Sequence, residues 1–109
     1  MEELVDERGT EARLEELSDA VGSAVLKITG ELDISNVGSV QTAIQATFGG
    51  GLDSLVFDLS ELEFIDSSGL AMLLALAERI DTVELRRPSP LVCRLIELTG
   101  LAEVFKITT

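Results

Sequence analysis

The sequence predicts one α/β domain, in which a small mixed sheet of four or five strands packs against about three helices. Short apolar stretches with a two-residue period alternate along the chain with stretches whose apolar residues recur every three or four positions. Such alternation is typical of a mostly parallel or mixed sheet covered by helices. The 109 residues suit one domain. We divide it into an acidic segment at 1–19, part of the same domain, and a core at 20–109.

The first half of the chain predicts two strands followed by a helix. Residues 11–17 fit an edge strand, although their charges fit a helical turn equally well. Residues 24–29 alternate between apolar and other side chains, as in a strand, and Gly30 is expected to end it. Ser35 is the predicted N-cap of the helix, and the glycines at 49–51 are expected to end it.

The second half predicts three further strands and two helices. The apolar run at 55–57 is typical of a central strand buried on both faces. A short loop leads to Phe64 and Ile65 and then to the turn at 66–69. Residues 70–79 predict a helix that is apolar nearly all round, which implies deep burial or a partner surface. The remaining expected features are a strand over 82–86, a Ser89 N-cap with Pro90 at the first helical position, a helix over 91–98, a left-handed Gly100 and a strand over 104–107.

The charge of the chain argues against two classes of partner. The net charge is −12, and residues 1–19 alone contain eight acids and two bases. Nucleic acid and anionic membranes both require a basic surface, so we expect neither as a partner. No stretch has the pattern of a signal peptide or the length of a membrane span. A cytoplasmic location is therefore expected by elimination.

The residue types also argue against catalysis. The chain has no histidine and one cysteine, which excludes a Ser-His-Asp triad and leaves no set of zinc ligands. It has no glycine-rich phosphate-binding loop, and we expect no cofactor, no metal and no enzymatic activity. Cys93 is interpreted as buried apolar filler, with an oxidative dimer as the alternative.

The turn Asp66-Ser67-Ser68-Gly69 carries the remaining chemistry, because it lies between an apolar stretch and the apolar helix. One interpretation is structural: Ser67 or Ser68 caps the helix, while Asp66 adds favourable charge at its positive end. The other is a switch, since a phosphate added to a serine at a helix N-terminus would meet unpaired N–H groups and change the surface charge. The two interpretations are compatible.

Four parts of the sequence form a recognisable set: GELD at 30–33, FDLS at 57–60, FIDSSGL at 64–70, and the C-terminal PSPLV at 88–92 with LIELTGL at 95–101. In this order and spacing they resemble the STAS domain family, and most closely its bacterial anti-sigma-factor antagonists. The resemblance runs from about residue 24 to 107 and implies a small mixed sheet with packed helices. Two departures are a shortened stretch at 70–88 and Ile34, which stands where polar residues are common; Ile34 could be a partner contact or a buried residue.

The resemblance implies a regulatory binding protein. Such a protein binds an anti-sigma factor that is also a serine kinase, which frees the sigma factor; phosphorylation of the antagonist breaks the complex and a phosphatase resets it. The implied acceptor is Ser67, and Asp33, Asp66, Ser68 and Gly69 are the implied partner-binding residues beside it. We expect a monomer. The alternative is a structural STAS subunit of a lipid-transport or stress-sensing assembly, in which the serine would matter only as a cap.

Overall fold

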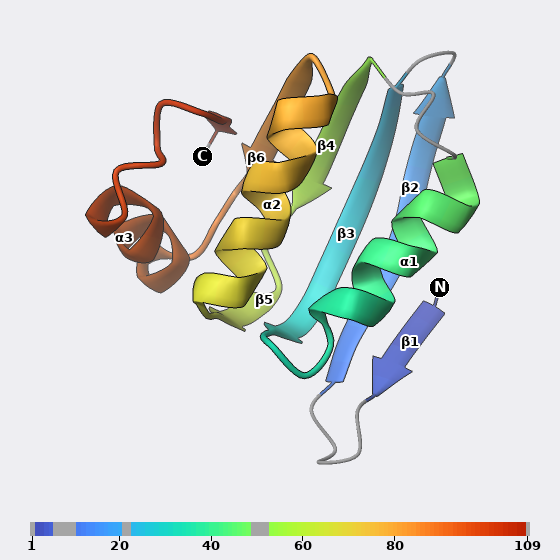
Figure 1. The fold of residues 1–109 in the computed structure, drawn as a ribbon, viewed down its shortest axis with the longest axis horizontal. Coiled ribbons are helices and arrows are strands. Elements are labelled where there is room, and N and C mark those ends of the chain that lie inside the picture. Colours follow the sequence, from blue (N-terminus) through green and yellow to red (C-terminus); the bar gives the residue numbers. More distant parts are fainter. Residues whose placement is uncertain (1, 6–10, 21–22, 49–52, 109) are drawn as a thin grey trace.

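The computed structural model describes residues 2–5, 11–20, 23–48 and 53–108, which form one mixed sheet and three helices (Figure 1). The strands are β1 (Glu2–Val5), β2 (Glu11–Ala20), β3 (Ser23–Leu32), β4 (Ser54–Asp58), β5 (Leu62–Ile65), β6 (Thr82–Arg86) and β7 (Lys106–Thr108), and the helices are α1 (Val37–Phe48), α2 (Ser67–Arg79) and α3 (Pro90–Leu98). The strand order is β1-β2-β3-β4-β6-β7, and β5 pairs with the end of β3. The predicted α/β class and the three helices are confirmed.

The sheet has more strands than the four or five that we predicted. The strands from β3 to β7 pair in parallel, and β2 and β1 extend the sheet in the antiparallel sense. The segment with two interpretations at 11–17 lies within β2, and it is not at the edge because β1 pairs with its outer side. The predicted order of elements did not include β5: its two ends are buried and its middle is exposed, so it shows no alternation.

The core lies between one face of the sheet and the helices. Alternate residues of β3, β4 and β6 point to this face and are buried: Ala24, Leu26, Ile28, Leu55, Phe57, Val83 and Leu85. Figure 1 shows α1 and α2 lying next to each other across this face, and the two helices contact each other. The expectation that β4 is buried on both faces is half right, because Val56 on the opposite face is only half-buried.

Several predicted boundaries shift, each for a local physical reason. Gly30 does not end its strand: it adopts a left-handed φ of 99°, where the pairing with β5 changes register, and β3 continues to Leu32. Ser35 is not the N-cap of α1, since the helix begins only at Val37. The glycines at 49–51 lie outside the described residues.

The C-terminal third follows the prediction more closely. Ser89 caps α3 by accepting a hydrogen bond from the N–H of Val92, and Pro90 occupies the first helical turn. Gly100 has the expected left-handed φ, 76°. The last strand, β7, is shifted towards the C-terminus relative to the expected 104–107.

A buried carboxylate ties the end of β4 to the segment after β6. The Asp58 side chain accepts a hydrogen bond from the Ser60 N–H at 3.0 Å and pairs with the guanidinium of Arg87. Arg87 holds an unusual left-handed φ of 54°, and its own N–H donates to the Thr108 carbonyl at 2.6 Å. Burial raises the pKa of Asp58, but the bonds from Ser60 and the charge of Arg87 lower the pKa by more, so the net direction is down.

We predict that Asp58→Asn destabilises the protein at pH 7 and that this loss shrinks in acid. Because the folded state lowers the pKa of Asp58, the stabilisation is complete above the unfolded value of about 4 and is lost as the pH falls through the folded value. We expect a loss of about 1–3 kcal/mol at pH 7, the usual cost of weakening a buried charged hydrogen bond. Urea unfolding at pH 7 and pH 3.5 measures both, with exposed Glu63→Gln as the control. An equal loss at both pH values would contradict the prediction.

Candidate functional site

The N-terminus of α2 is capped by an aspartate and not by a serine. Asp66 has the extended backbone of an N-cap residue, and its Oδ1 accepts hydrogen bonds from the N–H groups of Ser68 at 2.8 Å and Gly69 at 3.0 Å. The expectation that Ser67 or Ser68 is the cap is therefore wrong. Both serines already lie inside the helix, so the residue in the capping position is the one before them.

This arrangement leaves the Ser67 hydroxyl available. Ser67 is the first residue of α2 and its side chain is exposed, whereas Ser68 is half-buried. Among the described residues, the Ser67 hydroxyl has no hydrogen-bond partner. A hydroxyl that is exposed and not used by the fold can be modified without removing an interaction that stabilises the helix.

Gly69 lets the start of α2 approach the sheet closely. It is buried, and a Cβ at this position would lie 2.6 Å from Cγ1 of Ile65 and 2.9 Å from the carbonyl oxygen of Leu32. Both distances are too short for real atoms, and the second involves backbone that cannot rotate away. The glycine therefore sets how close the turn lies to β3 and β5, and any effect it has on a partner acts through the shape of the turn.

The loop between β3 and α1 is held by its own hydrogen bonds. The Asp33 carboxylate accepts from the N–H and hydroxyl of Ser35, and the Asp33 carbonyl accepts from the N–H groups of Asn36 and Val37. Asn36 is 1% exposed; its Nδ2 donates to the Glu31 carbonyl at 2.8 Å, and its Oδ1 accepts from the Asp33 N–H at 3.1 Å. A buried asparagine that satisfies two backbone groups fixes the loop.

Sequence reasoning missed Asn36. The available signal was an Asp-x-Ser-Asn run directly before a helical pattern, since Asp and Asn commonly bond to nearby backbone in such turns. No hydrogen bond of the Asp33 or Asp66 carboxylate among the described residues goes to the Ser67 hydroxyl. That these two acids place the hydroxyl and shape the docking surface stays a prediction.

The second oxygen of Asp66 joins the loop to the turn. Oδ2 accepts a hydrogen bond from the Ile34 N–H at 3.1 Å, while the Asp66 N–H donates to the Leu32 carbonyl at 3.1 Å. The end of β3, the loop that follows it and the start of α2 are thus connected through one residue. Through the backbone of Ile34, the structure connects the loop that contains Asp33 to Asp66, although the two acids are far apart in the sequence.

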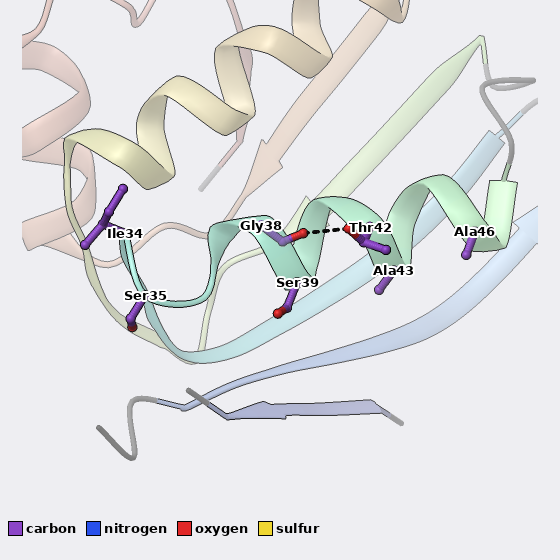
Figure 2. Close-up of a pocket in the computed structure, with 7 residues that line it drawn as sticks. All are labelled: Ile34, Ser35, Gly38, Ser39, Thr42, Ala43 and Ala46. Atoms are coloured by element: carbon purple, nitrogen blue, oxygen red, sulfur yellow. Dashed lines mark hydrogen bonds between the residues drawn. The ribbon is translucent and has the colours of Figure 1, made fainter. Parts of the chain in front are cut away.

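An open groove runs along α1 from this site (Figure 2). Its volume is about 680 Å³, and Figure 2 shows Ile34 at one end and Ala46 at the other, with Ser39 and Thr42 between them. Ile34 is 66% exposed, so the interpretation of this residue as buried is wrong.

Cys93 is half-buried on α3. Among the described residues, no group of three or more His, Cys, Asp or Glu could hold a metal ion, and no helix could cross a membrane.

The chain is similar to known STAS proteins over most of its length. The family model described as "Mlab, STAS domain" matches residues 15–108. The anti-sigma-F factor antagonist RsfB of Mycobacterium tuberculosis is 39% identical over 64 residues, which cover 59% of this chain and 52% of RsfB. The match thus spans about half the length of that relative. An anti-sigma F factor antagonist of Lysinibacillus sphaericus is 30% identical over 84 residues, 72% of each chain.

Solved structures of similar proteins have the same fold. An anti-sigma factor antagonist from Mycobacterium paratuberculosis superposes with a TM-score of 0.78 at 30% identity, covering 89% of this chain and 85% of the other. The anti-sigma factor antagonist SpoIIAA in its unphosphorylated form gives a TM-score of 0.75 at 24% identity, covering 89% of both chains. At that identity the second likeness shows the fold alone.

The cap assignment predicts that Asp66→Ala and Ser67→Ala differ in their effect on stability. Asp66→Ala removes the acceptor for two N–H groups of α2 and should cost about 1–2 kcal/mol. Ser67→Ala removes an exposed hydroxyl and should change stability by less than about 0.5 kcal/mol. Urea unfolding monitored by circular dichroism measures both. A larger loss of stability for Ser67→Ala than for Asp66→Ala would show that Ser67, and not Asp66, is the N-cap.

The close approach at Gly69 predicts opposite effects for two glycine-to-alanine changes. Gly69→Ala should destabilise the protein by about 1–3 kcal/mol, because a methyl group there overlaps Ile65 and the Leu32 carbonyl. Gly38→Ala on α1 has open space around it and should stabilise by about 0.5–1 kcal/mol, since alanine favours helix. Thermal unfolding of the pair checks the signs. A Gly69→Ala protein as stable as the wild type would show that the turn can move away from the sheet.

Proposed function

The chain belongs to the STAS domain family, and on that basis we propose that it is an anti-sigma-factor antagonist that is switched by phosphorylation of Ser67. In this proposal it binds an anti-sigma factor with serine kinase activity and so releases a sigma factor. A phosphatase restores the unmodified form. The protein is the substrate of the kinase and not an enzyme itself, and it acts as a monomer in the cytoplasm. The names of the M. tuberculosis and L. sphaericus relatives support the first part of the proposal.

The exposed, unpaired hydroxyl of Ser67 at the first position of α2 is the observation that carries the switch. In the phosphoryl transfer, the Ser67 oxygen attacks the γ-phosphorus of ATP bound to the kinase. The bond to the ADP oxygen breaks and the hydroxyl proton passes to a base of the kinase. The product carries about 1.5 to 2 additional negative charges at pH 7.

The cap made by Asp66 determines where that phosphate can go. The N–H groups of Ser68 and Gly69, which a phosphate at a free helix end would use, already donate to Asp66. Of the N–H groups in the first turn, the phosphate could therefore use that of Ser67 but not those of Ser68 and Gly69, and it would lie at the surface beside a carboxylate. A partner docked over the turn would meet both the bulk and the charge, which would weaken the complex while the fold of the antagonist persists.

The description of the matching family model names Mlab and the STAS domain and does not mention anti-sigma factors. The second candidate function is therefore that of a structural STAS subunit. In that alternative the protein is part of a lipid-transport or stress-sensing assembly and Ser67 is not modified. The two functions make different demands on Ser67, so the same experiment separates them.

We predict that one phosphate is added to Ser67 by a serine-kinase anti-sigma factor of the same organism. The purified protein is incubated with each such kinase and ATP, followed by intact-mass measurement and peptide mapping. We expect a single phosphate that is lost in Ser67→Ala and retained in Ser68→Ala, the matched control in the same turn. Phosphate on Ser68 instead of Ser67 would show that the proposal names the wrong serine. No phosphate from any of these kinases would favour the structural-subunit function.

A further inference from the structure

Ile34 is an exposed apolar side chain on a loop that is otherwise rigid. Its side chain is 66% exposed, although the residues around it in the sequence are fixed by the bonds of Asp33 and the buried Asn36. Its own N–H is bound by Asp66. The position of Ile34 is thus set before any partner arrives, and little conformational entropy would be lost when its side chain is covered.

The two segments that the hydrogen bond from Ile34 to Asp66 joins are acidic. The segments 31–36 and 61–69, which the bond from Ile34 to Asp66 joins, contain five carboxylates and neither lysine nor arginine: Glu31, Asp33, Glu61, Glu63 and Asp66. Of these, Glu61 pairs with Lys27 at 2.6 Å. The remaining four have no cationic partner among the described residues, so the two joined segments carry an excess of negative charge.

The place of Ile34 connects it directly to the proposed switch. One hydrogen bond links its backbone to Asp66, the residue immediately before Ser67. In Figure 2, Ile34 stands at the end of the groove along α1 that lies nearest to the start of α2. Phe64 on β5 is also partly exposed, two residues before Asp66, but it is less exposed than Ile34. Leu98 on α3 is as exposed as Ile34 and has no hydrogen bond to the turn among the described residues. An anchor at Ile34 and a phosphate at Ser67 would therefore act on the same docked surface.

We propose that Ile34 determines partner specificity: it inserts into an apolar pocket of the anti-sigma factor, and lysine or arginine residues around that pocket face the acidic surface. This inference rests on the proposed function, because it names the contact through which the same partner is recognised. The charge complementarity selects a basic partner surface, and the isoleucine supplies the apolar contact that charge alone does not give.

The test compares substitutions at Ile34 with an equally exposed leucine elsewhere. The probe is the anti-sigma factor kinase of the same organism, with the anti-sigma-F factor of M. tuberculosis as reference, and the dissociation constant is measured by calorimetry. Ile34→Ala should weaken binding about tenfold, as expected when most of a buried aliphatic side chain is removed. Leu98→Ala, whose side chain is 67% exposed, should leave binding unchanged. All variants should unfold at the wild-type temperature, because both side chains are exposed.

Two charged substitutions test the chemistry of the partner surface. Ile34→Lys places a positive charge against the proposed basic rim and should weaken binding more than Ile34→Glu, with the gap narrowing as salt is added. If the wild type binds but Ile34→Ala binds equally well, or Leu98→Ala is equally weakened, the inference fails and the proposed function stands. Stronger loss for Ile34→Glu than for Ile34→Lys would also overturn it. Absence of binding by the wild type would overturn the proposed function together with the inference.

Discussion

The geometry of the site depends on the hydrogen bonds of the Asp66 carboxylate. One oxygen accepts hydrogen bonds from the N–H groups of Ser68 and Gly69 in the first turn of α2, and the other accepts one from the N–H of Ile34 in the loop after β3. The backbone N–H of Asp66 completes the set by donating to the last residue of β3, Leu32. Together with the bond from the Leu70 N–H to the Asp66 carbonyl, five hydrogen bonds of one residue thus join a strand, a loop and a helix. Gly69 has no side chain and so allows the helix to start close against the sheet.

This arrangement separates the residue that stabilises the helix from the residue that we propose is modified. If Ser67 were the cap, a phosphate on it would remove the cap and add charge at once, and the switch would also loosen the helix. With Asp66 as the cap, the same modification leaves the hydrogen bonds of Asp66 in place. The change is then confined to the surface, which is what a reversible change of partner requires of a protein that must stay folded in both states.

Much of this architecture was predictable from the sequence, and the failures have identifiable causes. Periodicity gave the core strands and helices because their buried residues alternate or recur regularly, as in Leu26 and Ile28 of β3. It failed at β5, where four residues show no period, and at Gly30, which lies inside its strand in a left-handed conformation. The local sequence predicted the turn correctly, but we assigned the N-cap of α2 to a serine and not to Asp66. Choosing between neighbouring cap residues depends on where the helix begins, and this is set by tertiary contacts such as those at Gly69.

The same contacts explain why recognition and switching can vary independently in this fold. The backbone of Ile34 is needed to bind Asp66, but its side chain points away from the core and is 66% exposed. Any residue with an N–H would preserve the bond and therefore the geometry around Ser67. Substitution at this position can change which surface is recognised without disturbing the cap, whereas substitution at Gly69 or Asp66 would disturb both. A partner-specific residue is therefore most easily accommodated where the fold uses only the backbone.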